Sequence, residues 1–292
     1  MSAVLAMASR NIQVYVRDRM SVFFSFLSVI IIIGLYALFL GKVQTEGIQA
    51  AAGNIKGVRA LVDSWIMAGL LAVNAITISL GVLGTMVFDK EYKRFADFIV
   101  APASRTGIVV SYLIAAWVIS LVFSFIAFAA GELYIVAGGG PLLSLRNAAR
   151  VAGMLTLDVV CSSSVMFFVA SFLKSGSAFG ALATILGTLI GFITGVYVPL
   201  GVMPGAVQKF VILVPFTHGA AMLRQAFCEA PLAKVFTGAP PAMEAQYARE
   251  YGIQLFWGNT AISMPVMVAV LAGSALLFLL LSAARLRKIK SA

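Results

Sequence analysis

Charged residues are scarce in this sequence, and long stretches of it contain none. Only 11% of the 292 residues are charged, 61% are hydrophobic, and the mean hydropathy is +1.02. A helix needs about 20 apolar residues to cross the hydrocarbon core of a bilayer, and a charge near its centre is costly. This composition excludes an ordinary soluble domain, and we expect an integral membrane protein. The uncharged stretches are Ser21–Gly41, Ser64–Phe88, Thr106–Gly131, Ser175–Gln208 and Tyr251–Ala284.

Cysteine and histidine are also nearly absent, with two cysteines and one histidine. Cys161 lies in a predicted span and Cys228 in a predicted outer loop, so no intrachain disulfide is expected. No cluster of metal-ligating residues occurs, and we expect no metal site. The chain lacks both the phosphate-binding G-x-x-x-x-G-K-[ST] pattern and the G-x-S-x-G hydrolase pattern. It is therefore predicted to be no enzyme and to bind no cofactor itself.

The charges that remain give a net charge of +10, and their distribution predicts the orientation in the membrane. Basic residues are dense in short segments on one predicted side, which the positive-inside rule assigns to the cytoplasm. Both termini are thus expected in the cytoplasm, in a cell (plasma or inner) membrane, and no nucleic-acid partner is expected. The basic clusters are Arg10, Arg17 and Arg19; Lys90, Lys93, Arg94 and Arg105; Lys174; and Arg285, Arg287, Lys288 and Lys290.

The apolar stretches predict an all-α fold with six transmembrane helices in a single domain of residues 1–292. Only the fourth span contains a formal charge in its interior, Asp158. In the fifth span, glycines recur at a spacing that permits close helix packing, at Gly180, Gly187, Gly191 and Gly195. The predicted spans are Met20–Leu40, Ser64–Phe88, Ile108–Ala130, Arg150–Phe172, Ala178–Val198 and Ala261–Ala284.

Two segments on the predicted cytoplasmic side are amphipathic. In residues 1–19, apolar side chains recur at helical spacing, which predicts an interfacial helix. In residues 89–105, a mixed-charge helix ending before Pro102 is predicted. Two interpretations of this helix remain open: it docks onto a partner protein, or it only anchors its loop at the membrane interface.

The stretch 199–224 is hydrophobic but contains Pro199, Pro204 and Pro215, so it cannot be one straight helix. We expect two half-helices that enter the outer leaflet and return, since such backbone is tolerated where protein covers it. Residues 41–63 and the polar segment 228–258 are expected to be outer loops.

Two of these segments resemble signatures of ABC type-2 transporter permeases. The second-span exit FDKEYKRFADFIVAPAS resembles the acidic-basic segment of that family. The segment that begins GVYVPLGVMPG and ends PFTHGAAMLRQ is similar to its second signature, a proline-rich re-entrant pair followed by a P-x-T/S-H/Y…R pattern. Phe95–Ala96 stands where the family frequently has Gly-Thr. The matching residues are Pro199, Met203, Pro204, Pro215, Thr217, His218 and Arg224.

The resemblance implies a permease that pairs with a second copy or a paralogue in the lipid bilayer. ABC ATPase subunits would bind ATP and Mg on the cytoplasmic side and drive a drug, lipid, peptide or glycan precursor outward. The re-entrant residues would cover the outer end of the pathway, and Asn74 and Asp158 would line it. The residues expected to dock the ATPase are Arg10, Tyr15, Arg17, Asp89, Glu91, Tyr92, Lys93, Arg94 and Phe98.

Asp158 and His218 leave alternatives open. Asp158 could contact a cationic substrate, relay a proton, or pair with Arg150 across a bent helix; otherwise it is a hydrated structural residue. A proton relay would make the chain a secondary carrier or channel that needs no ATPase. His218 could sense pH or make a structural hydrogen bond in the re-entrant turn.

Overall fold

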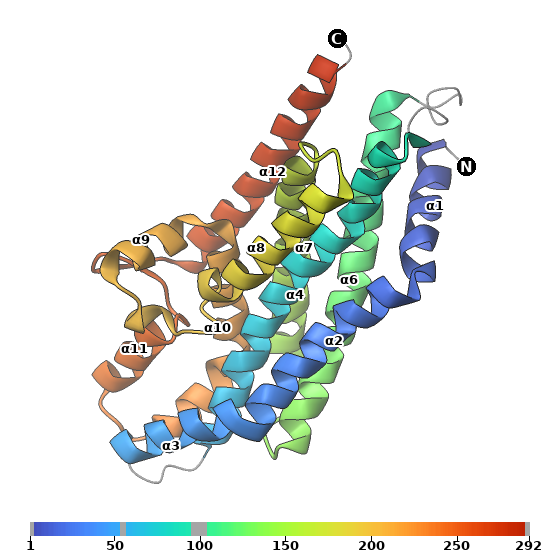
Figure 1. Cartoon of the computed structure of the whole chain (residues 1–292). Helices are drawn as coiled ribbons and strands as arrows, with labels where there is room; N and C mark the ends of the chain where they lie inside the picture. Colours follow the sequence, from blue (N-terminus) through green and yellow to red (C-terminus); the bar gives the residue numbers. More distant parts are fainter. Residues whose placement is uncertain (1–2, 53–56, 95–103, 290–292) are drawn as a thin grey trace.

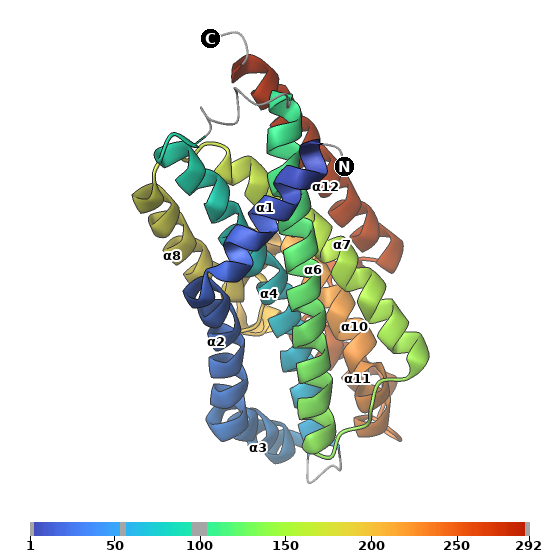
Figure 2. The same cartoon turned by 90° about the vertical axis from the view of Figure 1, so that its right-hand side faces the viewer.

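The computed structural model describes residues 3–52, 57–94 and 104–289, which form a bundle of long helices with both termini at one end (Figure 1). We refer to this as the termini end. Helix α3 and the turn between α6 and α7 lie at the opposite end (Figure 2). The N-terminal half contains α1 (Ala3–Arg17), α2 (Arg19–Leu35), the π-helix η1 (Tyr36–Leu40), α3 (Gly41–Ala52), α4 (Val58–Glu91) and α6 (Arg105–Ala137).

The second half contains one short hairpin among its helices. Strands β1 (Phe256–Trp257) and β2 (Thr260–Ala261) are antiparallel, with Phe256 opposite Ala261 and Trp257 opposite Thr260. The helices are α7 (Leu145–Ala170), α8 (Gly176–Ile193), the 3₁₀ turn η2 (Leu200–Val202), α9 (Gly205–Leu213), α10 (Pro215–Val235), α11 (Pro241–Glu250) and α12 (Met264–Ile289).

Serine and proline mark where several of these helices begin. The side chains of Ser104, Ser144 and Ser175 accept hydrogen bonds from backbone N–H groups in the first turns of α6, α7 and α8. These bonds satisfy donors that a helix start otherwise leaves unpaired. Pro215 occupies the first position of α10 and Pro241 that of α11, where the missing proline N–H costs nothing.

The all-α membrane fold is confirmed. Within the described residues, α4, α6, α7, α8 and α12 are long and apolar enough to cross a membrane. The count of six spans stays a prediction, because α2 is only 17 residues long and continues directly into η1 over the predicted first span. The 34 residues of α4 extend about 51 Å at 1.5 Å per residue, which exceeds the hydrocarbon thickness.

Helix α4 is the centre of the bundle and is surrounded by α6, α7, α8 and α10 (Figure 2). Its side chains are buried along almost the whole helix, from Val58 to Asp89. Small residues permit this close packing: Gly131 of α6 lies against Met67, and Gly84 of α4 lies against the ring of Phe179 in α8. A displacement of α4 therefore acts on all four neighbouring helices.

Three local predictions are corrected by the structure. Residues 41–52, expected in a loop, form helix α3, because η1 carries the helix on without a break. Residues 228–258 are not an irregular loop: Cys228 is buried within α10, and α11, most of which is exposed, and the hairpin follow. The re-entrant segment is a short helix α9 bent by 91° against α10, which continues to Val235 and is much longer than a half-helix.

The cytoplasmic helix expected over 89–105 also differs. Asp89 and Glu91 belong to the end of α4, and the helix stops at Tyr92, where Lys93 adopts a left-handed conformation with φ of 58°. A residue with left-handed backbone dihedral angles cannot continue a right-handed helix, so the regular helix ends here. Residues 95–103, which include Phe98 and Pro102, lie outside the described residues.

Candidate functional site

Asp89 is the centre of a hydrogen-bonded cluster near the termini end. Its side chain is 1% exposed, and Arg10 of α1 binds both carboxylate oxygens, with Nη2 donating to Oδ1 at 3.1 Å. The hydroxyl of Tyr112 in α6 donates to Oδ2 at 2.6 Å, and Nη1 of Arg94 donates to Oδ1 at 3.2 Å. One buried carboxylate thus joins α1, α4 and α6. We call Arg10, Asp89, Arg94 and Tyr112 the Asp89 cluster.

Further contacts fix α1 along its length. Asn11 donates to the hydroxyl of Ser111 in α6 at 3.0 Å. Tyr15 shares a hydrogen bond of 2.8 Å with Ser25 of α2, and its ring packs edge-on against Phe123. The hydrogen bond from the Arg10 guanidinium to Asp89 raises the pKa of Arg10 above its usual value. Helix α1 is therefore attached to the bundle by specific polar contacts as well as by its apolar face.

The residues predicted to dock a partner fall into two groups. Asp89 and Tyr15 are buried, so in this conformation neither can contact another protein; they hold α1 in place instead. Arg17, Glu91, Tyr92, Lys93 and Arg94 are exposed, with Tyr92 at 63%. Arg10 is partly exposed, and Phe98 lies outside the described residues.

Glu91 also connects two helices. Its Oε2 accepts a hydrogen bond of 3.0 Å from the backbone N–H of Gly176, the first residue of α8. A carboxylate is favoured there because the helix N-terminus carries partial positive charge. The end of α4 and the start of α8 are thus joined, a contact that the sequence did not reveal.

The predicted pathway residues lie inside the subunit. Asn74 of α4 and Asp158 of α7 are buried, and among the described residues none hydrogen-bonds to their side-chain oxygen or amide atoms. Asp158 packs directly against Gly219 of α10. It does not pair with Arg150, whose Nη1 donates instead to Glu229 of α10 at 3.0 Å. Both residues therefore face helix–helix contacts in this conformation.

The re-entrant residues tie α9 and α10 to the end of α8. The Thr217 hydroxyl donates to the carbonyl oxygens of Val211 and Ile193, at 2.7 and 2.9 Å. Nε2 of His218 lies 2.8 Å from the carbonyl oxygen of Ile212, so His218 makes a hydrogen bond within the turn. Pro199 and Pro204 directly precede η2 and α9.

Arg224 extends this arrangement to α4. It is fully buried, its Nη2 donates to the carbonyl oxygen of Gly195 at 3.0 Å, and its guanidinium lies 4.7 Å from the ring centroid of Trp65. Glycines make room for it, since a Cβ on Gly69 would lie 2.9 Å from Nη2. A cation–π contact of this kind stabilises a desolvated guanidinium by about 2 kcal/mol. Trp65, distant in sequence, carries no signal that predicts this contact.

Comparison with known families decides the assignment. The family model described as ABC-2 type transporter matches residues 2–228, which is well over half of the chain. The chain belongs to the ABC-2 type transporter family. It is a permease subunit of an ABC transporter and a multi-pass membrane protein. A comparison with curated proteins gave no match.

The matched range includes the Asp89 cluster and the re-entrant segment up to Cys228, whereas α11, the hairpin and α12 follow it. Members of this family are generally non-catalytic transmembrane subunits, and the family implies association with ABC ATPase subunits. In the permease, the exposed residues beside the Asp89 cluster are thus the natural candidates for that contact.

Proposed function

We propose that the permease is half of an ATP-driven exporter in the cell membrane, with both termini in the cytoplasm and ATP and Mg bound by separate ATPase subunits. It would move an amphipathic or large substrate outward, such as a drug, lipid, peptide or glycan precursor. The observation that carries this proposal is the Asp89 cluster. It connects exposed residues near the termini end to α4, the helix that contacts most of the bundle.

Coupling would begin at the exposed turn Tyr92–Arg94 and on α1. Closure of the ATPase pair would displace this turn, and Arg94 and Asp89 would transmit the displacement to Arg10 and Tyr112. Because Glu91 binds the first residue of α8, that helix would move with α4. The device is mechanical: the hydrogen bonds of Asp89 and Glu91 keep α1, α4, α6 and α8 in a fixed relation while the bundle tilts.

A second copy of the chain would cover α8. Ile185, Leu189 and Phe192 of this helix are exposed, although α8 belongs to the spans. At about 100° per residue these three side chains fall on one side of the helix, away from Gly187, which borders the groove against α4. A homodimer or a pair with a paralogue would bury this face.

The groove between α4 and α8 suits an apolar or amphipathic substrate. It encloses about 150 Å³, and its lining is aliphatic and aromatic except for the hydroxyl of Thr77. Asn74 lies one helical turn from Thr77 on α4, and rotation of α4 would bring its amide toward the groove. Pairing of two copies through α8 would place two such grooves side by side.

Asp158 supports a second candidate, a proton-coupled secondary carrier. An ionisable residue inside a membrane span is costly and often marks a functional site. The carboxyl group of Asp158 also lacks a hydrogen-bond partner among the described residues. Asp158 packs against Gly219, and no cation of the described residues lies within salt-bridge distance of it. The carrier therefore has less support from Asp158 than the exporter has from the Asp89 cluster.

Transport in proteoliposomes distinguishes the two candidates. The permease reconstituted with its ATPase should extrude a lipophilic probe only with ATP, and Asp158→Asn should leave the ATP dependence intact. Uptake driven by a proton gradient without ATP, abolished by Asp158→Asn, would support the carrier and contradict the exporter.

A further inference from the structure

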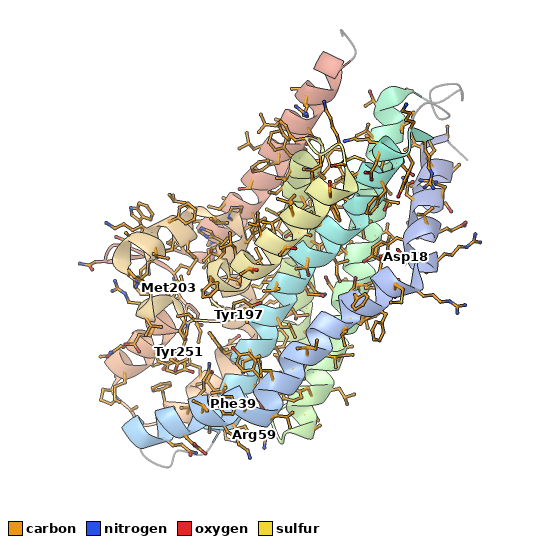
Figure 3. All side chains as sticks on the ribbon, in the orientation of Figure 1. Asp18, Phe39, Arg59, Tyr197, Met203 and Tyr251 are labelled. Atoms are coloured by element: carbon orange, nitrogen blue, oxygen red, sulfur yellow. The ribbon has the colours of Figure 1, made fainter. Side chains whose placement is uncertain are left out.

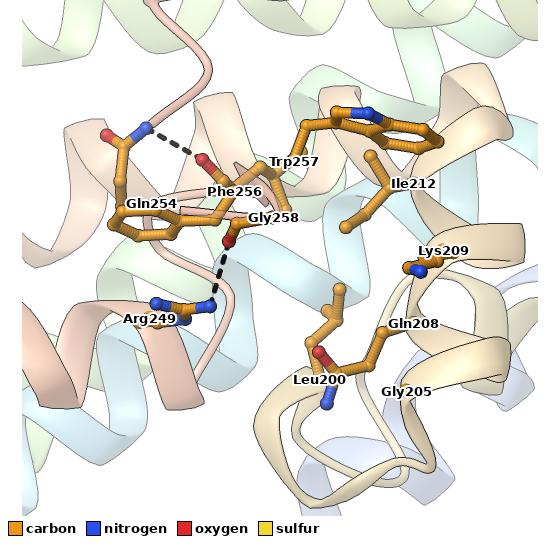
Figure 4. Close-up of a pocket in the computed structure, with 11 residues that line it drawn as sticks. Leu200, Gly205, Gln208, Lys209, Ile212, Arg249, Gln254, Phe256, Trp257 and Gly258 are labelled. Atoms are coloured by element: carbon orange, nitrogen blue, oxygen red, sulfur yellow. Dashed lines mark hydrogen bonds between the residues drawn. The ribbon is translucent and has the colours of Figure 1, made fainter. Parts of the chain in front are cut away.

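A cavity of about 170 Å³ lies between α9 and the β1–β2 hairpin (Figure 4). One face of α9 forms one wall, through Gly205, Gln208, Lys209 and Ile212. These positions follow the i, i+3, i+4, i+7 spacing of a single helical face. Arg249 of α11 and the segment from Gln254 to Gly258 form the other wall, with Leu200 between them.

The cavity is lined by two cations and by no Asp or Glu among the described residues. Arg249 is held in place, because its Nη2 donates to the carbonyl oxygen of Gly258 at 3.0 Å and its guanidinium lies 4.7 Å from the Phe256 ring centroid (Figure 4). Lys209, on the opposite wall, makes no ion pair with any described residue. An anion between the walls would meet both charges.

Helix lengths place this cavity at a membrane boundary. Helix α8 has 18 residues, and the uncharged part of α12, Met264–Ala284, has 21. At 1.5 Å per residue these lengths are about 27 and 32 Å, close to one hydrocarbon thickness. Both helices run from the termini end to the level of α9 (Figure 1). Trp257 on the cavity wall is half exposed, as is typical of tryptophan in the headgroup region.

The remaining face of α9 suits the acyl region of a membrane. Val207, Phe210 and Leu213 are exposed, the last two at 64% and 68%. With the 91° bend against α10, α9 resembles an interfacial helix that lies in the plane of the membrane. Its cationic, cavity-lining face and its apolar face thus meet along one short helix.

We propose that the cavity binds the phosphate-bearing headgroup of an anionic phospholipid from the leaflet opposite the termini, with the acyl chains along the exposed face of α9. Lysine and arginine together favour phosphate oxygens, and Leu200, Ile212 and Trp257 supply apolar contacts that a free anion cannot use. This lipid would be a resident ligand that stabilises the junction of α9, α11 and the hairpin. The proposal does not depend on ATP-driven export.

The test is lipid binding to the purified full-length permease in detergent, measured by native mass spectrometry. Phosphatidylglycerol should bind more tightly than phosphatidylcholine with the same acyl chains. The double variant Lys209→Gln/Arg249→Gln should lose affinity for phosphatidylglycerol by a factor on the order of ten or more. The matched control is Arg146→Gln/Lys234→Gln, which removes one exposed arginine and one exposed lysine outside the cavity and should bind like the wild type.

The Lys209 side chain makes no hydrogen bond with a described residue, so Lys209→Gln alone is the test if the Arg249 variant does not fold. A loss of affinity on the order of threefold or more is then expected. Equal binding of both lipids, or equal loss in the cavity and control variants, would overturn the proposal. Displacement of phosphatidylglycerol by inorganic phosphate at equal concentration would show a free-anion site and would overturn the lipid assignment.

Discussion

At the scale of single residues, burial changes the role that a charge was expected to have. Asp89 stands in a run of charged residues, which favoured an exposed docking role. Its side chain is instead enclosed by Arg10, 79 residues earlier, and by Tyr112, 23 residues later. Neither partner has a spacing relation to Asp89 that a sequence pattern reveals, so this role could not be predicted.

Replacing this carboxylate should weaken the fold. In Asp89→Asn, the guanidinium of Arg10 and the hydroxyl of Tyr112 face an uncharged amide. Loss of one partner of a buried pair costs about 4 kcal/mol, and because Arg10 is 32% exposed we expect about 2 kcal/mol here. The midpoint of thermal unfolding in detergent should fall clearly. Glu46→Gln, which removes an exposed carboxylate of α3 that makes no ion pair with a described residue, is the control, and an equal or smaller effect of Asp89→Asn would contradict the cluster's role.

Asp18 gives a second prediction at the residue scale. It lies at the bend between α1 and α2 (Figure 3), where its Oδ1 accepts from the backbone N–H of Ser21 at 3.1 Å. This is the geometry of an N-cap for α2. Asp18→Ala should lower stability by about 1 kcal/mol, whereas Asp18→Asn, which still caps, should lower it less. Equal losses in the two variants, measured by thermal unfolding, would exclude a capping role.

The pH dependence of this cap follows from its hydrogen bonds. The hydroxyl of Ser21 and then its backbone N–H hold the pKa of Asp18 below the usual aspartate value. Because the pKa is lowered in the folded state, ionised Asp18 contributes to stability at a pH above its pKa in the unfolded chain, about 3.9. This contribution is lost as the pH falls through the lower pKa of the folded state. The difference in stability between wild type and Asp18→Ala should thus be constant near neutral pH and decrease in acid, where the neutral carboxyl can still accept a hydrogen bond but no longer contributes its charge.

At the scale of helices, apolar length predicted most of the structure but not its interruptions. Five of the predicted spans overlap helices that are long and apolar enough to cross a membrane, and the spans Ser64–Phe88 and Ile108–Ala130 lie entirely within α4 and α6. The prolines indicated a broken segment at 199–224, and a 91° bend is present there. The continuation of α10 to Val235 was missed because its polar residues suggested a loop, whereas Cys228 and Phe227 pack against the core.

The contact between α7 and α10 depends on a glycine. A Cβ on Gly219 would overlap the carboxyl group of Asp158. Gly219→Ala should therefore separate the two helices and destabilise the protein by about 1–3 kcal/mol. Gly153→Ala, in α7, is the matched control, because its Cβ would meet no described atom within 4 Å and alanine favours the helix. If both variants unfold at the wild-type temperature, close packing at Gly219 is not important for stability.

At the scale of the whole molecule, composition and charge predicted an all-α membrane protein, and two short signatures indicated the family that the comparison then showed. The structure adds an exposed apolar face on α8. Leu189→Cys on this face should form a disulfide-linked dimer in membranes after mild oxidation, because both native cysteines are buried. Leu277→Cys on the exposed face of α12 is the control; cross-linking there and not at residue 189 would place the interface elsewhere.

The central claim is that separate ATPase subunits drive this permease through the turn beside Asp89. It is tested most directly by purifying the tagged chain from its native membranes in mild detergent and measuring the bound ATPase. We expect a stoichiometric ATPase subunit that carries a phosphate-binding loop. Tyr92→Asp/Lys93→Glu changes exposed residues outside the Asp89 cluster and should release that subunit without lowering thermal stability. A stable, folded permease that never binds an ATPase, or one that binds it equally well with both substitutions, would contradict the account.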